Sequence, residues 1–337
     1  MDQHSVIGMD IAKQVFQVHA VSPCGQIERT KLRRKQVHEF FANRPPAIIA
    51  MEACGSSHWW ARQLMSLGHE VVLLPPRLVR PFVLRNKTDA ADAQAIWTAA
   101  QQPGNKPVAV KSVTQQSTLA LHRLRSQLMK MRIMQSNSIR GLLYEFGETL
   151  PQNFRAMCKE LPQRWASLEE ALPAMLVETL REHWARVTEL DRQIAVIEKR
   201  LEVVREADPR CQQISKIPGV GVLTATAAVA AMGDPQSFRS GREFAAWLGL
   251  VPRQTGTGGR IRQLGISKRG DGYLRTLLMH AARAAILRRS KSPWLASLLG
   301  RRPFNVVVTA LAHKIARTIW AVLARRRDFD PALFAAG

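Results

Sequence analysis

Residues 5–10 read SVIGMD and residues 47–52 read AIIAME, and these two apolar stretches, each ending on an acid, decide the fold of the N-terminal part. Apolar runs of this length are typical of buried strands. Alternation across residues 15–21 (VFQVHAV) predicts another strand, and the turn at residues 23–25 leads into a third. The chain therefore opens with a β-meander and returns to the sheet at residues 47–52.

Helices separate the later strands. Helical patterns cover residues 38–43 and 57–67, and an apolar strand at residues 70–74 ends before Pro75 and Pro76. The order of three strands, helix, strand, helix, strand and helix predicts a mixed sheet flanked by helices. We expect an α/β domain at the N-terminus.

The bulk composition indicates a folded, strongly basic protein. The 337 residues are 46% hydrophobic and 22% charged, which is enough for at least two domains. The formal net charge is +23, and residues 211–337 hold 20 Lys and Arg against five Asp and Glu. Such an excess predicts a polyanionic partner, with DNA or RNA as the leading candidate.

Other classes of protein are disfavoured. No apolar run looks long enough to span a bilayer and no lipidation motif is present, so we expect no membrane partner. The four cysteines lie far apart, which argues against structural zinc. The first ten residues lack a secretory signal, so the sequence predicts a cytoplasmic protein.

The middle of the chain is helical. A helix over residues 88–102 opens on Thr88, a suitable capping residue, and a long basic helix covers residues 114–146. Its basic face either follows a phosphate backbone or is solvated. Apolar residues spaced by three and four along 173–205 predict a coiled-coil partner, in this chain or in a second subunit.

The C-terminal part is predicted to be mainly helical. Residues 217–221 (IPGVG) resemble a helix-hairpin-helix turn, whose backbone N–H groups can meet a phosphate. A glycine-rich segment, residues 255–259 (TGTGG), follows, and helices over 272–289 and 304–327 end the chain.

Four acids form the pattern that carries chemistry. Asp10 and Glu52 end two strands, and Asp89 and Asp92 share one face at the start of a helix. Clustered carboxylates repel one another, and a divalent cation relieves that cost. Hard oxygen ligands suit Mg²⁺ or Mn²⁺, and two such ions can drive phosphodiester cleavage. The alternative for each acid is a turn cap or a favourable place in the helix dipole.

Three motifs together resemble a known family. They are residues 7–13 (IGMDIAK), 51–55 (MEACG) and 85–93 (RNKTDAADA), with a C-terminal counterpart from 249–254 (GLVPRQ) to 266–271 (ISKRGD). This set resembles the DEDD insertion-sequence transposases guided by a bridge RNA. The likeness spans nearly the whole chain.

The resemblance implies an architecture and a reaction. It implies a RuvC-like catalytic domain of RNase H type over residues 1–110, a helical coiled-coil connector over 111–210, and a small helical transposase domain over 211–337. In the family the acids hold Mg²⁺, and a serine hydroxyl attacks DNA to form a covalent intermediate. The resemblance also implies DNA and a guide RNA as partners, and a dimer or tetramer.

The chain departs from the family at the nucleophile. Where the family usually has Ser followed by Gly, this chain has Thr257 and Gly258. Threonine keeps the hydroxyl, but its methyl group restricts χ1 and crowds the attack. Three possibilities follow. Thr257 is the nucleophile, Ser267 is the nucleophile instead, or the chain is a weakened copy or variant of the family. Ser267 can equally be a turn or capping hydroxyl.

Other residues are candidate nucleic-acid contacts. Basic residues beside the carboxylates or the glycine-rich segment suit phosphate, and glycines allow close backbone approach. These candidates are Arg85, Lys87, Arg253, Gly258, Gly259, Lys268, Arg269 and Arg275. The alternatives are solvated side chains and a flexible loop.

Three functions follow from these observations. The first is an RNA-guided, metal-dependent DNA transposase with a covalent intermediate, acting at the bacterial nucleoid. The second is a RuvC-like nuclease that uses the acids alone and leaves free ends. The third is a non-catalytic nucleic-acid-binding protein with structural acids.

Overall fold

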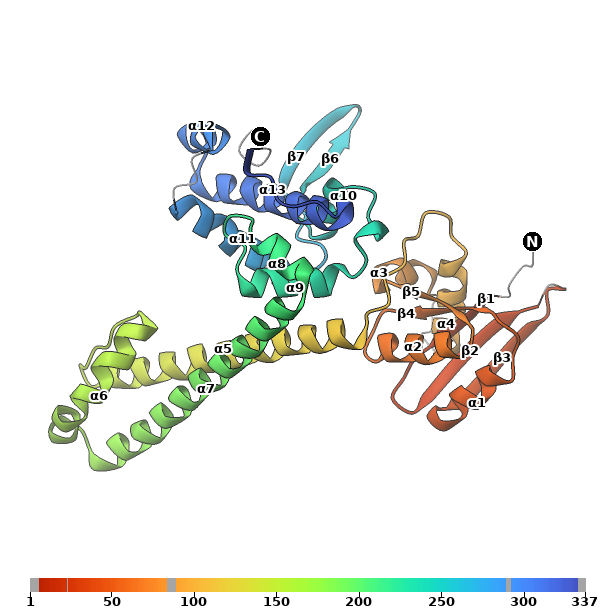
Figure 1. Ribbon diagram of the computed structural model, residues 1–337. Coiled ribbons are helices and arrows are strands. Elements are labelled where there is room, and N and C mark those ends of the chain that lie inside the picture. The colour runs from red at the N-terminus through yellow and green to blue at the C-terminus, as the bar shows by residue number, and fades with distance from the viewer. Residues whose placement is uncertain (1–5, 23, 84–88, 289–291, 333–337) are drawn as a thin grey trace. The chain divides into compact units, whose positions relative to one another are not determined.

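The computed structural model describes residues 6–22, 24–83, 89–288 and 292–332, and it divides into two compact units. The first unit covers Met1–Val113 and the second Thr114–Gly337. Figure 1 draws both, and each is described by itself.

The first unit is built on a five-stranded mixed sheet. Its strands are β1 (Val6–Asp10), β2 (Val15–Val21), β3 (Ile27–Arg33), β4 (Ile48–Glu52) and β5 (Glu70–Leu74), in the spatial order β3-β2-β1-β4-β5. The β1-β2 and β2-β3 pairs are antiparallel, whereas β4 runs parallel to both β1 and β5. The predicted mixed sheet is confirmed.

Helices cover both faces of this sheet (Figure 1). They are η1 (Arg34–Gln36), α1 (Val37–Ala42), α2 (Ser57–Ser66), α3 (Pro76–Val79), η2 (Arg80–Phe82) and α4 (Asp89–Ala100). One core cluster joins Ile7 and Met9 to Trp60 and Leu64 of α2. A second joins Ala50 to α4. Because side chains alternate along a strand, even-numbered residues of β1 and β4 face α4.

The second unit begins with three long helices, which are α5 (Val113–Glu145), α6 (Phe154–Ala171) and α7 (Ala174–Ala207). The predicted stripe from Val187 to Leu201 is buried, and ion pairs join Arg125 to Glu198 and Arg132 to Asp191 across α5 and α7. The coiled-coil partner of α7 is therefore α5 of the same chain. Helix α6 was not predicted.

The rest of the second unit is a helical core with one β-hairpin. Its elements are α8 (Pro209–Ser215), α9 (Val222–Met232), η3 (Pro235–Ser237), α10 (Gly241–Trp247), β6 (Pro252–Thr257), β7 (Arg260–Ile266), α11 (Gly272–Leu287), α12 (Pro293–Arg301) and α13 (Phe304–Arg325). The predicted turn joins α8 to α9, and Gly219 is required there. Its φ is +84°, and a Cβ would lie 2.0 Å from the carbonyl oxygen of Ala281.

The expectation that no apolar segment could span a bilayer needs correction. Within the described residues, α13 is long and apolar enough to cross a membrane by length and composition, with 56% of its apolar window buried. Its apolar side chains, such as Leu311, Ile315 and Ile319, belong to the core of the second unit. We therefore interpret α13 as a core helix.

Candidate carboxylate site and hydroxyl-bearing hairpin

Asp10 and Glu52 lie at the same edge of the sheet. Met9 of β1 pairs in parallel register with Met51 of β4, so each acid is the next residue of its strand. Both acids are half-buried. Asp10 lies two residues after Gly8, and Glu52 two residues after Ala50, so each acid is on the same face of its strand as that residue. They therefore project from the face that α4 covers.

Helix α4 carries the other two acids to this edge. Asp89 and Asp92 lie in its first turn, with Asp89 exposed and Asp92 half-buried. The helix packs directly on β1, because a Cβ at Gly8 would lie 2.4 Å from the Ala93 carbonyl oxygen. The indole N–H of Trp97 also donates to the carbonyl of Val6, at 3.1 Å. Gly8 therefore sets how closely α4 approaches the sheet.

The charges of the other three acids all act on Asp10. Burial raises the pKa of Asp10 to about 6, and the negative charges of Asp92, Asp89 and Glu52 add to the shift in that order. A backbone hydrogen bond from Ile11 opposes it. Asp10, Asp89 and Asp92 form no ion pair with any residue that the structure describes. The edge thus concentrates negative charge.

The donor set suits a hard divalent cation, although its side chains do not form a ligand shell. Across the described ranges, no group of three His, Cys, Asp or Glu side chains is close enough to hold a metal ion. The charges of three acids still raise the pKa of Asp10, although the side chains are too far apart to share a metal ion, because Coulomb forces act well beyond ligand distances. Like-charged carboxylates separate unless a cation draws them together. Carboxylate oxygens are the ligands that Mg²⁺ and Mn²⁺ prefer.

A cysteine lies beside the carboxylates. Cys54, two residues after Glu52, has its pKa raised by burial and then by the charges of Glu52 and Asp10. Its thiol therefore stays protonated beside the carboxylates. Arg85 and Lys87, the expected phosphate contacts, lie outside the described residues.

Thr257 lies at the tip of the β6-β7 hairpin. It pairs with Arg260 across a two-residue turn, in which Gly258 and Gly259 have φ values of +58° and +78°. Positive φ at both positions is the requirement of a type I′ hairpin turn, which favours glycine. Every residue of β6 is exposed, so the Thr257 hydroxyl faces solvent.

Ser267 lies at the other end of the hairpin. It follows β7, and its N–H donates to the carbonyl of Val251 at 2.8 Å. Seven residues at about 3.4 Å each separate it from the tip, or roughly 24 Å. The two candidate hydroxyls therefore cannot occupy the same place at a scissile phosphate.

The basic residues around the hairpin divide into two kinds. Arg253, Lys268 and Arg269 are exposed and can reach a phosphate. The Arg275 guanidinium donates to the carbonyls of Leu248 and Arg269, at 2.9 and 3.1 Å. These two hydrogen bonds hold the base of the hairpin. The role of Arg275 in binding phosphate stays a prediction.

Sequence reasoning missed two features that position these groups. One is Gly8, whose signal was a glycine inside an apolar strand, a mark of close backbone approach. The other is the β6-β7 hairpin. Its signal was the Gly258-Gly259 pair, which is typical of a two-residue turn.

Comparison with known proteins identifies the family. A family model described as a transposase, of the DEDD type, matches residues 7–147, and a model of the IS116/IS110/IS902 transposase family matches residues 211–298. A probable family 20 transposase of Pseudomonas aeruginosa is 47% identical, covering 97% of this chain and 99% of its own length. The chain belongs to the IS110 family of insertion-sequence transposases.

Two further relatives are similar to this transposase along almost its whole length. The transposase of the insertion sequence IS1111A from Coxiella burnetii is 39% identical, over 98% of this chain and 92% of its own. That of IS1328 from Yersinia enterocolitica is 38% identical, over 98% and 100%. The chain is therefore a DNA transposase, and the predicted family is confirmed.

Proposed function

We propose that this transposase cuts and rejoins DNA through a divalent-cation site at Asp10, Glu52, Asp89 and Asp92. The observation that carries the proposal is geometric: Asp10 and Glu52 end adjacent parallel strands on the face that α4 covers, and Asp89 and Asp92 lie in the first turn of α4. Burial, and then the charges of the other three acids, raise the pKa of Asp10 to about 6. Carboxylates held together against their own repulsion are typical of functional sites. The mixed-sheet unit would then be a RuvC-like domain of RNase H type.

The four acids would hold Mg²⁺, with Mn²⁺ as a substitute. When bound, the ions supply charge that favours attack at phosphorus and departure of the leaving oxygen. Asp10 and Glu52 present their oxygens from adjacent strand ends. Asp89 and Asp92 present theirs from α4, whose closeness Gly8 allows.

A hydroxyl group of the chain would act as the nucleophile. We favour Thr257, because it is exposed at the hairpin tip, beside two glycines that let a nucleic-acid backbone approach. Its Oγ–P bond would form as the P–O bond to the leaving nucleotide breaks. The hydroxyl proton is lost, and the leaving oxygen gains one. The covalent adduct keeps the phosphodiester energy for rejoining.

The partners follow from charge and from family resemblance. We propose that the chain binds its DNA under the direction of a guide RNA, as a dimer or tetramer in the bacterial cytoplasm at the nucleoid. The proposed phosphate contacts are Arg85, Lys87, Arg253, Gly258, Gly259, Lys268, Arg269 and Arg275. The division into domains at residues 1–110, 111–210 and 211–337 is part of the same proposal.

A metal-dependent nuclease without a covalent intermediate is the second candidate. The threonine at position 257 favours it, because the extra methyl group crowds attack at phosphorus. Under this alternative a water molecule replaces the hydroxyl, and the products are free ends.

One assay separates these functions. Purified full-length protein, its element-end DNA and RNA that co-purifies with it would be incubated with Mg²⁺, and denaturing gels would score cleavage and protein–DNA adducts. We expect both products with wild type, neither with Asp10→Asn, and no adduct with Thr257→Ala. Ser267→Ala is the matched hydroxyl control and should form the adduct. Undiminished cleavage by Asp10→Asn would overturn the proposal.

A further inference from the structure

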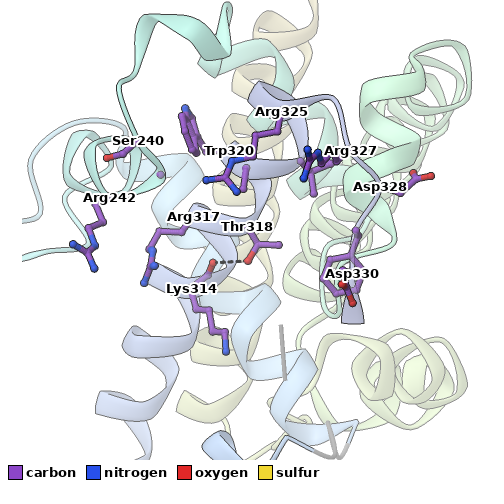
Figure 2. Close-up of a pocket in the computed structure, with 14 residues that line it drawn as sticks. Ser240, Arg242, Lys314, Arg317, Thr318, Trp320, Arg325, Arg327, Asp328 and Asp330 are labelled. Atoms are coloured by element: carbon purple, nitrogen blue, oxygen red, sulfur yellow. Dashed lines mark hydrogen bonds between the residues drawn. The ribbon is translucent and has the colours of Figure 1, made fainter. Parts of the chain in front are cut away.

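A large basic cavity lies in the second unit, away from the hairpin in the sequence. Its volume is about 720 Å³, and its walls come from the start of α10, the C-terminal half of α13 and the segment that follows α13. Figure 2 shows the side chains that line it. Five are cationic, namely Arg242, Lys314, Arg317, Arg325 and Arg327.

Packing between α10 and α13 brings two of these arginines together. A Cβ at Gly241 would lie 2.9 Å from the Arg317 carbonyl oxygen, so the glycine lets α10 begin directly on α13. The neighbouring Arg242 then lies beside Arg317 (Figure 2). The pKa of the half-buried His313 is lowered by burial, then by the charge of Arg317 and then by that of Arg242, so both guanidinium groups act on this ring.

The segment around the cavity is held in place. The Trp320 indole donates to the carbonyl of Pro235 at 3.0 Å, and the Gln236 amide donates to the carbonyl of Ala324 at 2.8 Å. These bonds fix η3 and the start of α10 against α13. The cationic walls are thus built into the fold rather than carried on separate loops.

The four arginines of the cavity, Arg242, Arg317, Arg325 and Arg327, form no ion pair within the described residues. Two acids also line the cavity, but each has another partner. Asp328 pairs with Lys216 at 3.0 Å, and Asp330 accepts from the N–H of Ala332 at 2.8 Å. The lining carries five cations against two acids, and this excess of positive charge favours binding of an anion.

The spacing of the arginines selects a polyanion over a single small anion. Arg317 and Arg325 are eight residues apart on α13, or roughly 12 Å at 1.5 Å per residue. A nucleic-acid strand carries one phosphate per roughly 3.4 Å of helix axis, so one strand can meet both ends of the cavity. Guanidinium groups suit phosphate because they donate two parallel hydrogen bonds.

We propose that this cavity binds the phosphodiester backbone of a nucleic acid at consecutive phosphates, with Arg242 and Arg317 as its principal contacts. The site goes beyond the proposed carboxylate chemistry, because it serves binding and holds no reacting group. DNA and RNA share this backbone chemistry, and the experiment below distinguishes them.

The test measures binding by the full-length protein across a salt series. Fluorescence anisotropy would be followed with a labelled 30-base-pair DNA duplex and, separately, a labelled 30-nucleotide RNA. The Arg242→Gln/Arg317→Gln double variant should bind at least one probe about tenfold more weakly at 0.1 M salt. Its slope of log K against log salt should fall by about 1.8 with the DNA duplex or by about 1.4 with the single-stranded RNA, since each lost phosphate contact removes about 0.9 or about 0.7. The probe that responds identifies the bound strand.

Two further variants keep the test specific. Arg301→Gln/Arg302→Gln removes the same charge from exposed positions of the same unit outside the cavity, and should leave both slopes nearly unchanged. Arg242→Lys/Arg317→Lys keeps the charge and should keep the salt slope. Unchanged slopes for both probes in the cavity variant, or an equal loss in the 301/302 control, would overturn the proposal. No step depends on cleavage, so a failure of the carboxylate chemistry leaves this result readable.

Discussion

At the scale of single residues, the proposed covalent step depends on which hydroxyl meets the phosphate. Thr257 and Ser267 occupy opposite ends of the β6-β7 hairpin, so a substitution at either one reports on that end alone. Only the tip residue is flanked by glycines with positive φ, which leave the space above its backbone open. We therefore propose Thr257, at the tip, as the attacking residue.

Thr257→Ser should speed formation of the protein–DNA adduct several-fold. The substitution keeps the hydroxyl and removes the methyl group that restricts χ1 and crowds the approach to phosphorus. Quench-flow sampling with gel analysis of the adduct measures the rate. An adduct rate in Thr257→Ser as low as in Thr257→Ala would contradict the assignment.

At the scale of elements, the position of α4 on β1 sets how near Asp89 and Asp92 lie to Asp10 and Glu52. Gly8→Ala should move α4 outward, because the new Cβ would lie 2.4 Å from the Ala93 carbonyl and 2.7 Å from the Trp97 nitrogen. We expect cleavage to fall tenfold or more and the melting temperature to fall by several degrees. Gly55→Ala is the control, since a Cβ there meets nothing within 4 Å. Equal activity in the two variants would show that this approach is unimportant.

A buried polar chain holds α5 against the C-terminal helices. His122 of α5 bonds through Nδ1 to the Tyr273 hydroxyl at 2.9 Å and through Nε2 to the Thr226 hydroxyl at 3.0 Å. Thr226 donates its own proton to the Val222 carbonyl, so it accepts from Nε2. Nδ1 then accepts from Tyr273. These bonds suit a neutral imidazole that is protonated at Nε2.

This histidine should make the second unit sensitive to acid. Burial, then the charge of Arg125, lowers the pKa of His122 to about 4 from 6.5. Below pH 6.5 the unfolded chain binds a proton that the folded chain refuses, so stability is complete above 6.5 and is lost as pH falls toward 4. We expect this group alone to contribute about 2 kcal/mol of loss between pH 7.5 and pH 5.

Urea denaturation at the two pH values measures that loss. The His122→Gln variant is less stable at pH 7.5 because it loses buried bonds, but its stability should fall less between the two pH values than that of wild type. The same decrease in wild type and variant would count against a neutral buried imidazole.

At the scale of the whole molecule, the sequence predicted the parts that burial patterns control. Strands β1 and β4 are buried apolar runs, β2 has an alternating sequence, and the stripe on α7 is buried against α5, so each left an apolar run or an apolar period in the sequence. The β6-β7 hairpin is almost entirely exposed and left no such period. Its existence depends on turn chemistry at Gly258 and Gly259 instead.

The candidate site was predictable to the same extent. Asp10 and Glu52 could be paired in advance, because apolar strands that end on an acid bring those ends to one edge. The contribution of Gly8 could not, since it depends on how α4 crosses β1. The basic cavity was also beyond reach, because Arg242 and Arg317 are far apart in sequence and meet only through packing at Gly241.

Manganese binding tests the central claim most directly, because it observes the ion rather than the reaction. Electron paramagnetic resonance would titrate free Mn²⁺ against the full-length protein at pH 7.5. The account predicts saturable binding that weakens at least about tenfold in Asp10→Asn, Glu52→Gln and Asp92→Asn. Asp191→Asn, on α7, should bind as wild type does. Equal affinity in the wild type and all three site variants would contradict a cation site at this edge of the sheet.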